Sequence, residues 1–159
     1  MVARIGREKQ LYTPSGARVV AGTVILNADK TKVLMVSSQA RKDRWIIPKG
    51  GVEVDEANDY KQAALRETWE EAGAIGTITH YLGPVAGTCP TQFWDGPKTA
   101  KRENEFHFYE LELEKLEDVW PEGKERKRKW ADYQEAREEL LKHNRIELAV
   151  ALEKSSLKR

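Results

Sequence analysis

The chain has 159 residues, of which 33% are charged and 40% hydrophobic, and its formal net charge is +1. This is typical of a globular protein, so we expect a single domain over residues 1–159 with its core at about 17–145. The lone cysteine, Cys89, excludes an internal disulfide and a cysteine-based zinc site. Because no secretory signal and no run of about 20 apolar residues is found, we expect a soluble monomer, cytoplasmic or nuclear, without a membrane partner.

The first half of the chain predicts three strands and a helix. Residues 17–27 and 32–38 are rich in β-branched and aliphatic residues, and the polar stretch between them predicts a hairpin turn. Residues 44–48 predict a short strand that stops at Pro48. A helix is predicted over residues 58–72, with Asn58 as its N-cap and Gly73 as its stop.

The second half predicts two longer strands, at residues 76–88 and 104–113, and helices at 133–143 and 146–153. In the later strand Phe106 and Phe108 alternate with His107, which could face a site. Residues 89–103, including Phe93 and Trp94, show no period and predict a long loop. That loop is either a lid over a substrate or a loosely packed excursion. Mixed strands with a few helices indicate an α/β (α+β) fold around a mixed sheet.

The helix at residues 58–72 carries three glutamates close together. At about 100° per residue, Glu67, Glu70 and Glu71 share one face, and the apolar side chains lie on the other. Such like charges repel by roughly 0.2–0.5 kcal/mol per pair, so something must compensate. Converging carboxylates suit Mg²⁺ or Mn²⁺, whereas the alternative interpretation is an acidic face in solvent.

Charge is unevenly distributed along the chain. Residues 1–49 hold ten basic and three acidic residues, residues 50–73 hold seven acidic and two basic ones, and residues 124–129 are again basic. This pattern fits a cation site that serves an anionic ligand, or a solvated surface with local ion pairs. The glycine pair Gly50 and Gly51 favours the first interpretation, because a glycine-rich turn brings the backbone close to phosphate and metal.

The same residues resemble the Nudix box, G-x5-E-x7-R-E-U-x-E-E-x-G-U, where U is aliphatic. Gly50, Glu56 and the run from Arg66 to Ala74 carry the likeness, but nine residues separate Glu56 from Arg66 instead of seven. The U positions hold Thr68 and Ala74. An insertion where the loop meets the helix would explain the spacing. Further segments between about residues 7 and 145 resemble diphosphoinositol polyphosphate phosphohydrolases, particularly fungal ones. The implied fold is an α/β/α sandwich around a mixed sheet, with a loop–helix–loop catalytic motif.

The resemblance implies a role for each position. Glu67 and Glu71 would bind the metal with the backbone carbonyl of Lys49, Glu70 would be the general base, and Arg66 would orient the glutamates. The candidate phosphate contacts are Arg18, Ser37, Ser38, Lys49, Gly50, Gly51, Arg126, Arg128 and Arg145.

The implied function is a metal-dependent hydrolase that removes the β-phosphate from diphosphoinositol polyphosphates and also cleaves diadenosine polyphosphates. Its partner would be a small polyanion, not nucleic acid. One alternative keeps the same machinery but makes diadenosine polyphosphate, polyphosphate or an RNA cap the main substrate. Another is a non-catalytic module that binds inositol phosphate or RNA.

Overall fold

The computed structural model describes residues 1–4, 9–88 and 103–159. The elements in chain order are β1 (Arg18–Leu26), β2 (Val33–Ser37), β3 (Trp45–Ile46), β4 (Lys49–Gly51), the 3₁₀ helix η1 (Val54–Glu56), α1 (Tyr60–Ala72), β5 (Ala74–Thr88), β6 (Glu103–Leu116), β7 (Arg128–Ala131), α2 (Tyr133–Lys142) and α3 (Ile146–Lys154). The described strands form one sheet in the order β3-β2-β1-β6-β5, with β4 paired to β1 and β7 to β2. Strands β1 and β6 run parallel, and the other pairs are antiparallel.

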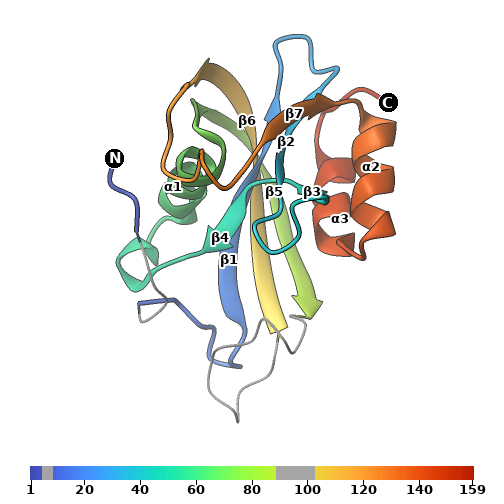
Figure 1. Cartoon of the computed structure of the whole chain (residues 1–159). Coiled ribbons are helices and arrows are strands. Elements are labelled where there is room, and N and C mark those ends of the chain that lie inside the picture. Colours follow the sequence, from blue (N-terminus) through green and yellow to red (C-terminus); the bar gives the residue numbers. More distant parts are fainter. Residues whose placement is uncertain (5–8, 89–102) are drawn as a thin grey trace.

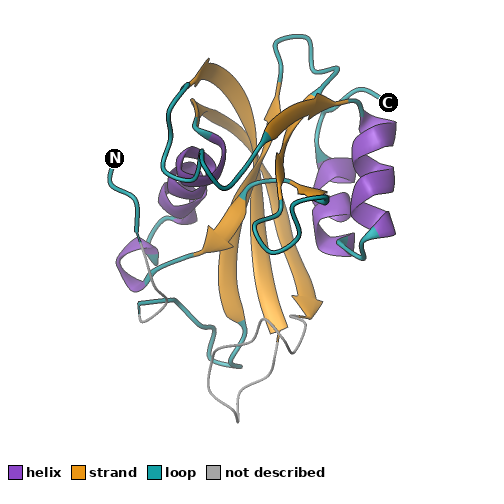
Figure 2. Cartoon of the chain, in the orientation of Figure 1, coloured by secondary structure: helices purple, strands orange, loops and turns teal. Residues whose placement is uncertain are grey.

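Helices cover both faces of this sheet. Figures 1 and 2 show α1 on one side, and α2 and α3 side by side on the other. The side chains of β1 alternate accordingly, since Val19 and Ala21 pack toward α1 while Val20 and Val24 join the larger core beneath α2 and α3. The predicted mixed sheet between helices is therefore confirmed. Within the described ranges, no helix is long and apolar enough to cross a membrane.

The strands differ from the sequence predictions in several places. The segment 44–48 contributes only the two-residue β3, and the glycine pair predicted as a turn lies in β4, paired with β1. Part of the basic run at 124–129 belongs to β7, which pairs with β2. We did not predict β7, because lysine and arginine obscure its alternation. Strands β5 and β6 are longer than predicted and pair with three register shifts.

Helix α1 begins two residues later than predicted and ends where predicted. Its N-cap is Asp59, not Asn58, and the Asp59 carboxylate accepts a hydrogen bond of 3.1 Å from the amide of Lys61. Gly73 ends the helix in the left-handed conformation, with φ of 63°, which glycine adopts without strain. These caps place the glutamates in the last two turns of α1.

Candidate active site

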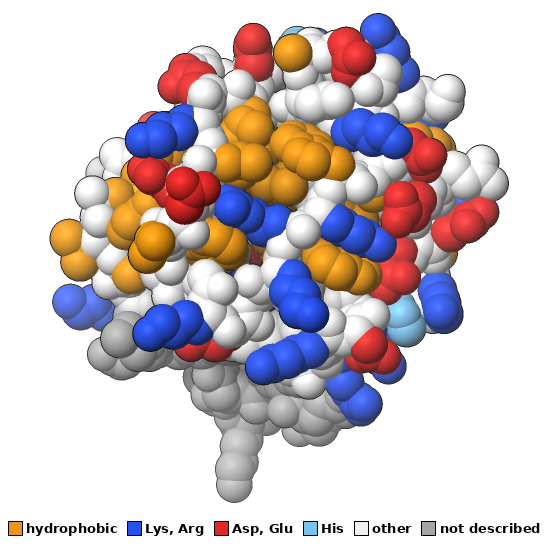
Figure 3. Space-filling view, turned by 45° about the horizontal axis from the view of Figure 1, so that its top comes forward, with side chains coloured by type: hydrophobic (Ala, Val, Ile, Leu, Met, Phe, Trp, Pro, Cys, Tyr) orange, Lys and Arg blue, Asp and Glu red, His pale blue; other side chains and the backbone are white. Residues whose placement is uncertain are grey.

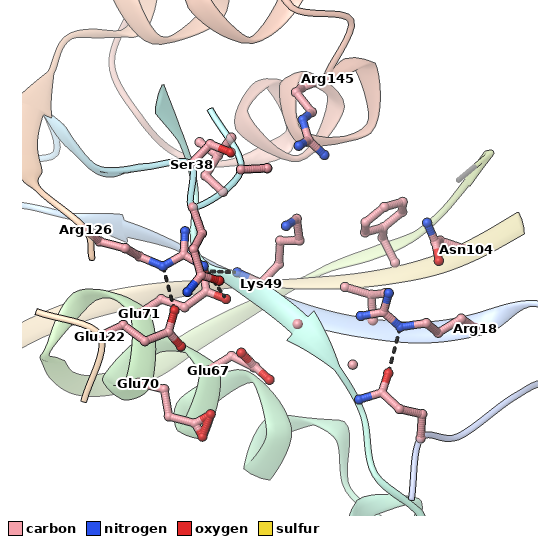
Figure 4. Close-up of a pocket in the computed structure, with 18 of the residues that line it drawn as sticks. Arg18, Ser38, Lys49, Glu67, Glu70, Glu71, Asn104, Glu122, Arg126 and Arg145 are labelled. Carbon is pink, nitrogen blue, oxygen red and sulfur yellow. Dashed lines mark hydrogen bonds and ion pairs between the residues drawn. The ribbon is translucent and has the colours of Figure 1, made fainter. Parts of the chain in front are cut away.

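A cleft of about 350 Å³ opens between the C-terminal half of α1 and the ends of β1, β4 and β6. One side, the acidic wall, consists of Glu67, Glu70 and Glu71. The other side, the basic wall, consists of Arg18, Lys49, Arg126 and Arg145. Figure 4 shows the two walls facing the same space. The structure thus brings together groups that suit a divalent cation and groups that suit a polyanion.

The acidic wall is buried. Glu67, Glu70 and Glu71 are 9%, 3% and 4% exposed, so the interpretation as a solvated acidic face is wrong. Burial, and then the neighbouring carboxylate of Glu71, raise the pKa of Glu67 well above its usual value. Burial likewise raises the pKa of Glu71, although Arg126 and Lys49 oppose this shift. Two buried carboxylates this close favour a proton or a cation between them.

Arg66 is the partner that the glutamate cluster requires. Its Nε and Nη2 donate to the two oxygens of Glu56, each at 2.9 Å. Its Nη1 donates to Glu67 at 2.9 Å and to Glu70 at 3.1 Å, and its Nη2 also reaches the carbonyl of Gly51 at 3.1 Å. Arg66 is only 5% exposed, so these are buried, charge-assisted bonds. The structure thus places Glu56 on Arg66 despite the longer spacing: Glu56 ends η1, and the nine residues between them form a short turn and the start of α1.

Glu70 is held from two sides. Besides Arg66, the main-chain amide of Arg4 donates to Glu70 Oε2 at 3.1 Å. The Arg4 guanidinium is itself held by Glu53 and Asp55, each at 2.7 Å. Burial raises the pKa of Glu70, and the Arg4 amide and the Arg66 guanidinium oppose this shift. A carboxylate with a raised pKa, fixed at the edge of a cleft, has the properties of a general base.

Gly50 and Lys49 shape the floor beside the acidic wall. A Cβ at Gly50 would collide with the carboxylate of Glu67, so a residue other than glycine would force this carboxylate to move. The amide of Lys49 donates to Glu71 Oε1 at 3.4 Å. Burial lowers the pKa of the Lys49 ammonium to about 8, against the attraction of Glu71. The ammonium is therefore mostly charged at neutral pH and available to an anion.

The acidic wall fits a magnesium-type ion. Among the described residues, no three acidic or imidazole groups form a complete metal-binding group by themselves. Mg²⁺ commonly takes only one or two protein carboxylates and completes its shell with water and substrate phosphate. Glu67 and Glu71 supply such oxygens, next to a backbone that glycine lets approach closely. These two residues are those that would hold the ion.

The basic wall contains four of the predicted phosphate contacts, and two of them, Arg18 and Arg126, are held by hydrogen bonds. Arg18 Nε donates to Gln10 at 2.7 Å. Arg126 Nη1 donates to the carbonyl of Ser37 at 2.9 Å, while its Nη2 lies 3.8 Å from Glu71. The remaining predicted residues that line the cleft are Ser38, Gly50, Gly51 and Arg145. Arg126 therefore touches both walls.

The structure does not bring two of the predicted phosphate contacts, Ser37 and Arg128, to the lining of the cleft. Ser37 is 2% exposed, and its hydroxyl accepts a bond of 2.8 Å from the amide of Lys127. Arg128 Nη1 donates to the carbonyls of Ala72 and Glu117 at 3.0 and 2.9 Å. Strand periodicity would put residues 126 and 128 on one face, but Arg126 lies before β7, which begins at Arg128, so it does not follow that periodicity. Only Arg126 lines the cleft.

Sequence reasoning missed several residues of the cleft. Glu122 lines it and accepts a bond of 2.7 Å from Arg126 Nε, and Gln10, Asn104 and Phe106 line it as well. Glu122 precedes Arg126 by four residues within an acidic-then-basic run, which was the available signal. Asn104 and Phe106 carry no local signal, because the pairing of β1 with β6 brings them near. Gln10 comes near through its bridge with Glu53.

The structure does not place His107 at the cleft. Its Nδ1 lies 2.7 Å from the Tyr81 hydroxyl and its Nε2 lies 2.7 Å from Glu105, and its ring packs against Tyr60. It lies on the α1 side of β6, outside the residues that line the cleft. The predicted loop at 89–103, with Phe93 and Trp94, lies outside the described residues apart from Glu103.

Comparisons with known proteins agree with this geometry. The NUDIX domain model matches residues 16–151. Nudix hydrolase 21, chloroplastic, from Arabidopsis thaliana is 35% identical over 86% of this chain, which spans only 66% of that relative. Diphosphoinositol polyphosphate phosphohydrolase 3-alpha from Mus musculus is 30% identical over 94% of this chain and 85% of its own length. The solved NUDIX hydrolase from Nitrosomonas europaea has a TM-score of 0.70 at 19% identity, with 87% of each chain covered, and so shares the fold.

Nudix hydrolases act on small polyphosphate substrates and generally need a divalent metal such as Mg²⁺ or Mn²⁺. The buried glutamates of α1, the arginine that neutralises them and the glycine beneath them occupy the positions of the Nudix box in this fold. With a domain match over most of its length, the chain belongs to the Nudix family.

Proposed function

We propose that the chain is an Mg²⁺- or Mn²⁺-dependent hydrolase that removes the β-phosphate from diphosphoinositol polyphosphates and also cleaves diadenosine polyphosphates. The main support for this function is that the buried acidic wall and the four cations of the basic wall face each other across one cleft. The name of the mouse relative, a diphosphoinositol polyphosphate phosphohydrolase, supports this substrate class. The name of the Arabidopsis relative states no substrate, so the chemistry of the cleft has to support the rest of the argument.

The lining of the cleft favours a ligand recognised by its charge. Among the described residues that line it, Phe106 is the one aromatic side chain, and it is only 6% exposed. This part of the cleft therefore offers no broad platform on which a nucleotide base could stack. Four cations around one opening suit a ring that carries many phosphates. We therefore place the diphosphoinositols before the dinucleotides.

The residues divide the work of hydrolysis between them. Glu70 takes a proton from water as the water oxygen attacks the β-phosphorus. The anhydride P–O bond then breaks, which releases inorganic phosphate and leaves the inositol polyphosphate. Arg18, Arg126 and Lys49 hold the phosphate groups, and Arg66 keeps Glu70 in place. A divalent ion bound by Glu67 and Glu71 would neutralise charge on the phosphate oxygens.

The direct test is release of inorganic phosphate from a diphosphoinositol polyphosphate by the purified protein, with Mg²⁺ or with a chelator. Diadenosine hexaphosphate and inorganic polyphosphate are assayed in parallel under the same metal condition. We expect the highest kcat/KM for the diphosphoinositol and loss of turnover with chelator. A higher kcat/KM for either of the other two compounds would make that compound the main substrate instead.

Variants test the assigned roles. Glu70→Gln and Glu71→Gln should each lower kcat by about 10²–10⁴-fold, as expected for loss of a base or of the group that holds the metal. Glu125→Gln is the matched control, because Glu125 is an exposed glutamate of the nearby turn. If the wild type binds diphosphoinositol but hydrolyses none of the three compounds with either metal, the chain is a binding module. Full activity in both site variants would refute the roles.

A further inference from the structure

The C-terminal end of α1 is capped by donors to four successive carbonyls. A helix leaves its last carbonyl groups without partners inside the helix. Here the segment at residues 117–128, which we call the strap, supplies donors to four of these carbonyls. The bonds are Glu122 N to Glu70 O at 3.0 Å, Trp120 Nε1 to Glu71 O at 3.0 Å, Arg128 Nη1 to Ala72 O at 3.0 Å and Glu117 N to Gly73 O at 2.8 Å.

Two side chains close the strap over the helix end. The Trp120 ring lies against Gly73, where an added Cβ would come within 2.8 Å of the ring. The Arg128 guanidinium lies over the Trp120 ring, with its Cζ atom 3.9 Å from the ring centroid. Arg128 Nη1 also bonds the carbonyl of Glu117, at 2.9 Å, so one guanidinium ties both the helix and the strap. Its positive charge further suits the negative end of the helix.

The capped carbonyls belong to the active site itself. Two of them are the main-chain oxygens of Glu70 and Glu71, whose side chains form part of the acidic wall. Repulsion among the buried glutamates favours fraying of the last turn, because fraying would separate them. The strap opposes this motion with donors to successive residues. Its bonds therefore hold the glutamates at the spacing that a shared cation requires.

We propose that Trp120 and Arg128 are positioning residues for the acidic wall, acting through the main chain of α1. This proposal rests on the proposed function, since it concerns the residues that would hold the metal and the base. It also assigns a role to Arg128, which the sequence placed among the phosphate contacts. Neither side chain is among the residues that line the cleft, so neither touches substrate.

The experiment compares Arg128→Lys and Trp120→Phe with the wild type. Lysine keeps the charge but loses the planar fork, and phenylalanine keeps an aromatic ring but loses the Nε1–H donor and part of the indole. We expect faster amide hydrogen exchange at residues 70–73 in both variants. For Arg128→Lys we expect about ten-fold weaker binding of Mn²⁺ and a similar fall in kcat, while KM for the diphosphoinositol stays within about two-fold. Trp120→Phe should show smaller changes in the same direction.

Lys127→Ala is the matched control, because it removes an exposed charge next to Arg128 and should leave all four readouts unchanged. If Arg128→Lys lowers the melting temperature but leaves Mn²⁺ affinity and kcat intact, the strap is only structural and the proposal fails. Unchanged exchange at residues 70–73 would also overturn it. A wild type that binds Mn²⁺ but hydrolyses nothing would refute the proposed function, while exchange and Mn²⁺ binding would still test the strap.

Discussion

The two walls of the cleft are built in opposite ways, although they face the same ligand. The acidic wall comes from residues 67–71 of one helix, and its carboxylates are buried. The basic wall takes its cations from β1, β4, the segment before β7 and the N-cap of α3. A dense local cluster of like charge needs strong support from its surroundings, whereas separate cations repel each other less. We therefore expect the acidic wall to fail abruptly on substitution and the basic wall to fail gradually.

Loss of Arg66 should give the largest effect, because it breaks the support of the acidic wall. Arg66→Ala leaves Glu56, Glu67 and Glu70 buried without their shared cation. We expect unfolding free energy to fall by about 3–5 kcal/mol and turnover to be lost. Urea unfolding measures the first effect and phosphate release the second.

The control for Arg66 is Arg137→Ala, which breaks an ion pair with Glu153 whose members are 45% and 46% exposed. That pair should contribute only about 0–1 kcal/mol. Similar losses of stability in both variants would mean that Arg66 is an ordinary surface partner, and the contrast between the walls would disappear.

Gly50→Ala tests the spacing within the acidic wall without removing a charge. The new methyl group would collide with the carboxylate of Glu67, which must move. A displacement of about 1 Å at a reacting group can lower kcat by about a hundred-fold. We expect a loss of this size in steady-state kinetics with little change in KM. Activity like that of the wild type would show that Glu67 has no fixed role.

Single substitutions in the basic wall should be milder. Arg18→Ala and Arg145→Ala should each raise KM for a diphosphoinositol by about ten-fold, which corresponds to about 1.4 kcal/mol, and leave kcat within about two-fold. The rise in KM should be smaller in high salt, because salt also weakens the attraction between the substrate and the cations that remain. Lys61→Ala, which removes an exposed charge from α1, is the control. A selective loss of kcat would place Arg18 or Arg145 with the acidic wall instead.

Glu110 gives the smallest expected effect on activity and shows why the acidic wall differs from other buried carboxylates. Burial tends to raise the pKa of Glu110. The amide and hydroxyl of Ser156, at 2.7 and 2.5 Å, lower it by more, so its pKa lies below the ordinary 4.5. Glu110→Gln should lower stability by about 1–3 kcal/mol at neutral pH with unchanged kcat.

The sign of this effect sets its pH dependence. A lowered pKa in the folded state stabilises the protein above the unfolded pKa of about 4.5, and this contribution disappears as pH falls through the folded value. The stability difference between wild type and Glu110→Gln should therefore shrink below pH 4.5, as measured by urea unfolding in acidic buffers. A difference that stays constant down to pH 3 would contradict this account.

Local patterns were enough to predict the acidic wall. Glu67, Glu70 and Glu71 share a helical face by spacing alone, and Gly73 marks the helix end because its left-handed conformation favours glycine. The same pattern could not reveal their burial, because it depends on strands that are distant in sequence. Arg126 and Arg128 show the limit most clearly. They carry the same charge two positions apart, yet Arg126 lines the cleft beside Glu71 and Arg128 caps α1.

The amino-acid sequence by itself determined the mixed α and β composition, the helix that holds the glutamates and their likeness to the Nudix box. These features depend on periodicities and caps within a few residues. Only the tertiary structure decided which cations complete the cleft, that Glu56 neutralises Arg66, and that Trp120 and Arg128 close the end of α1. Such contacts join residues ten to more than fifty positions apart, and they form only when strand pairing and helix packing bring those residues within bonding distance.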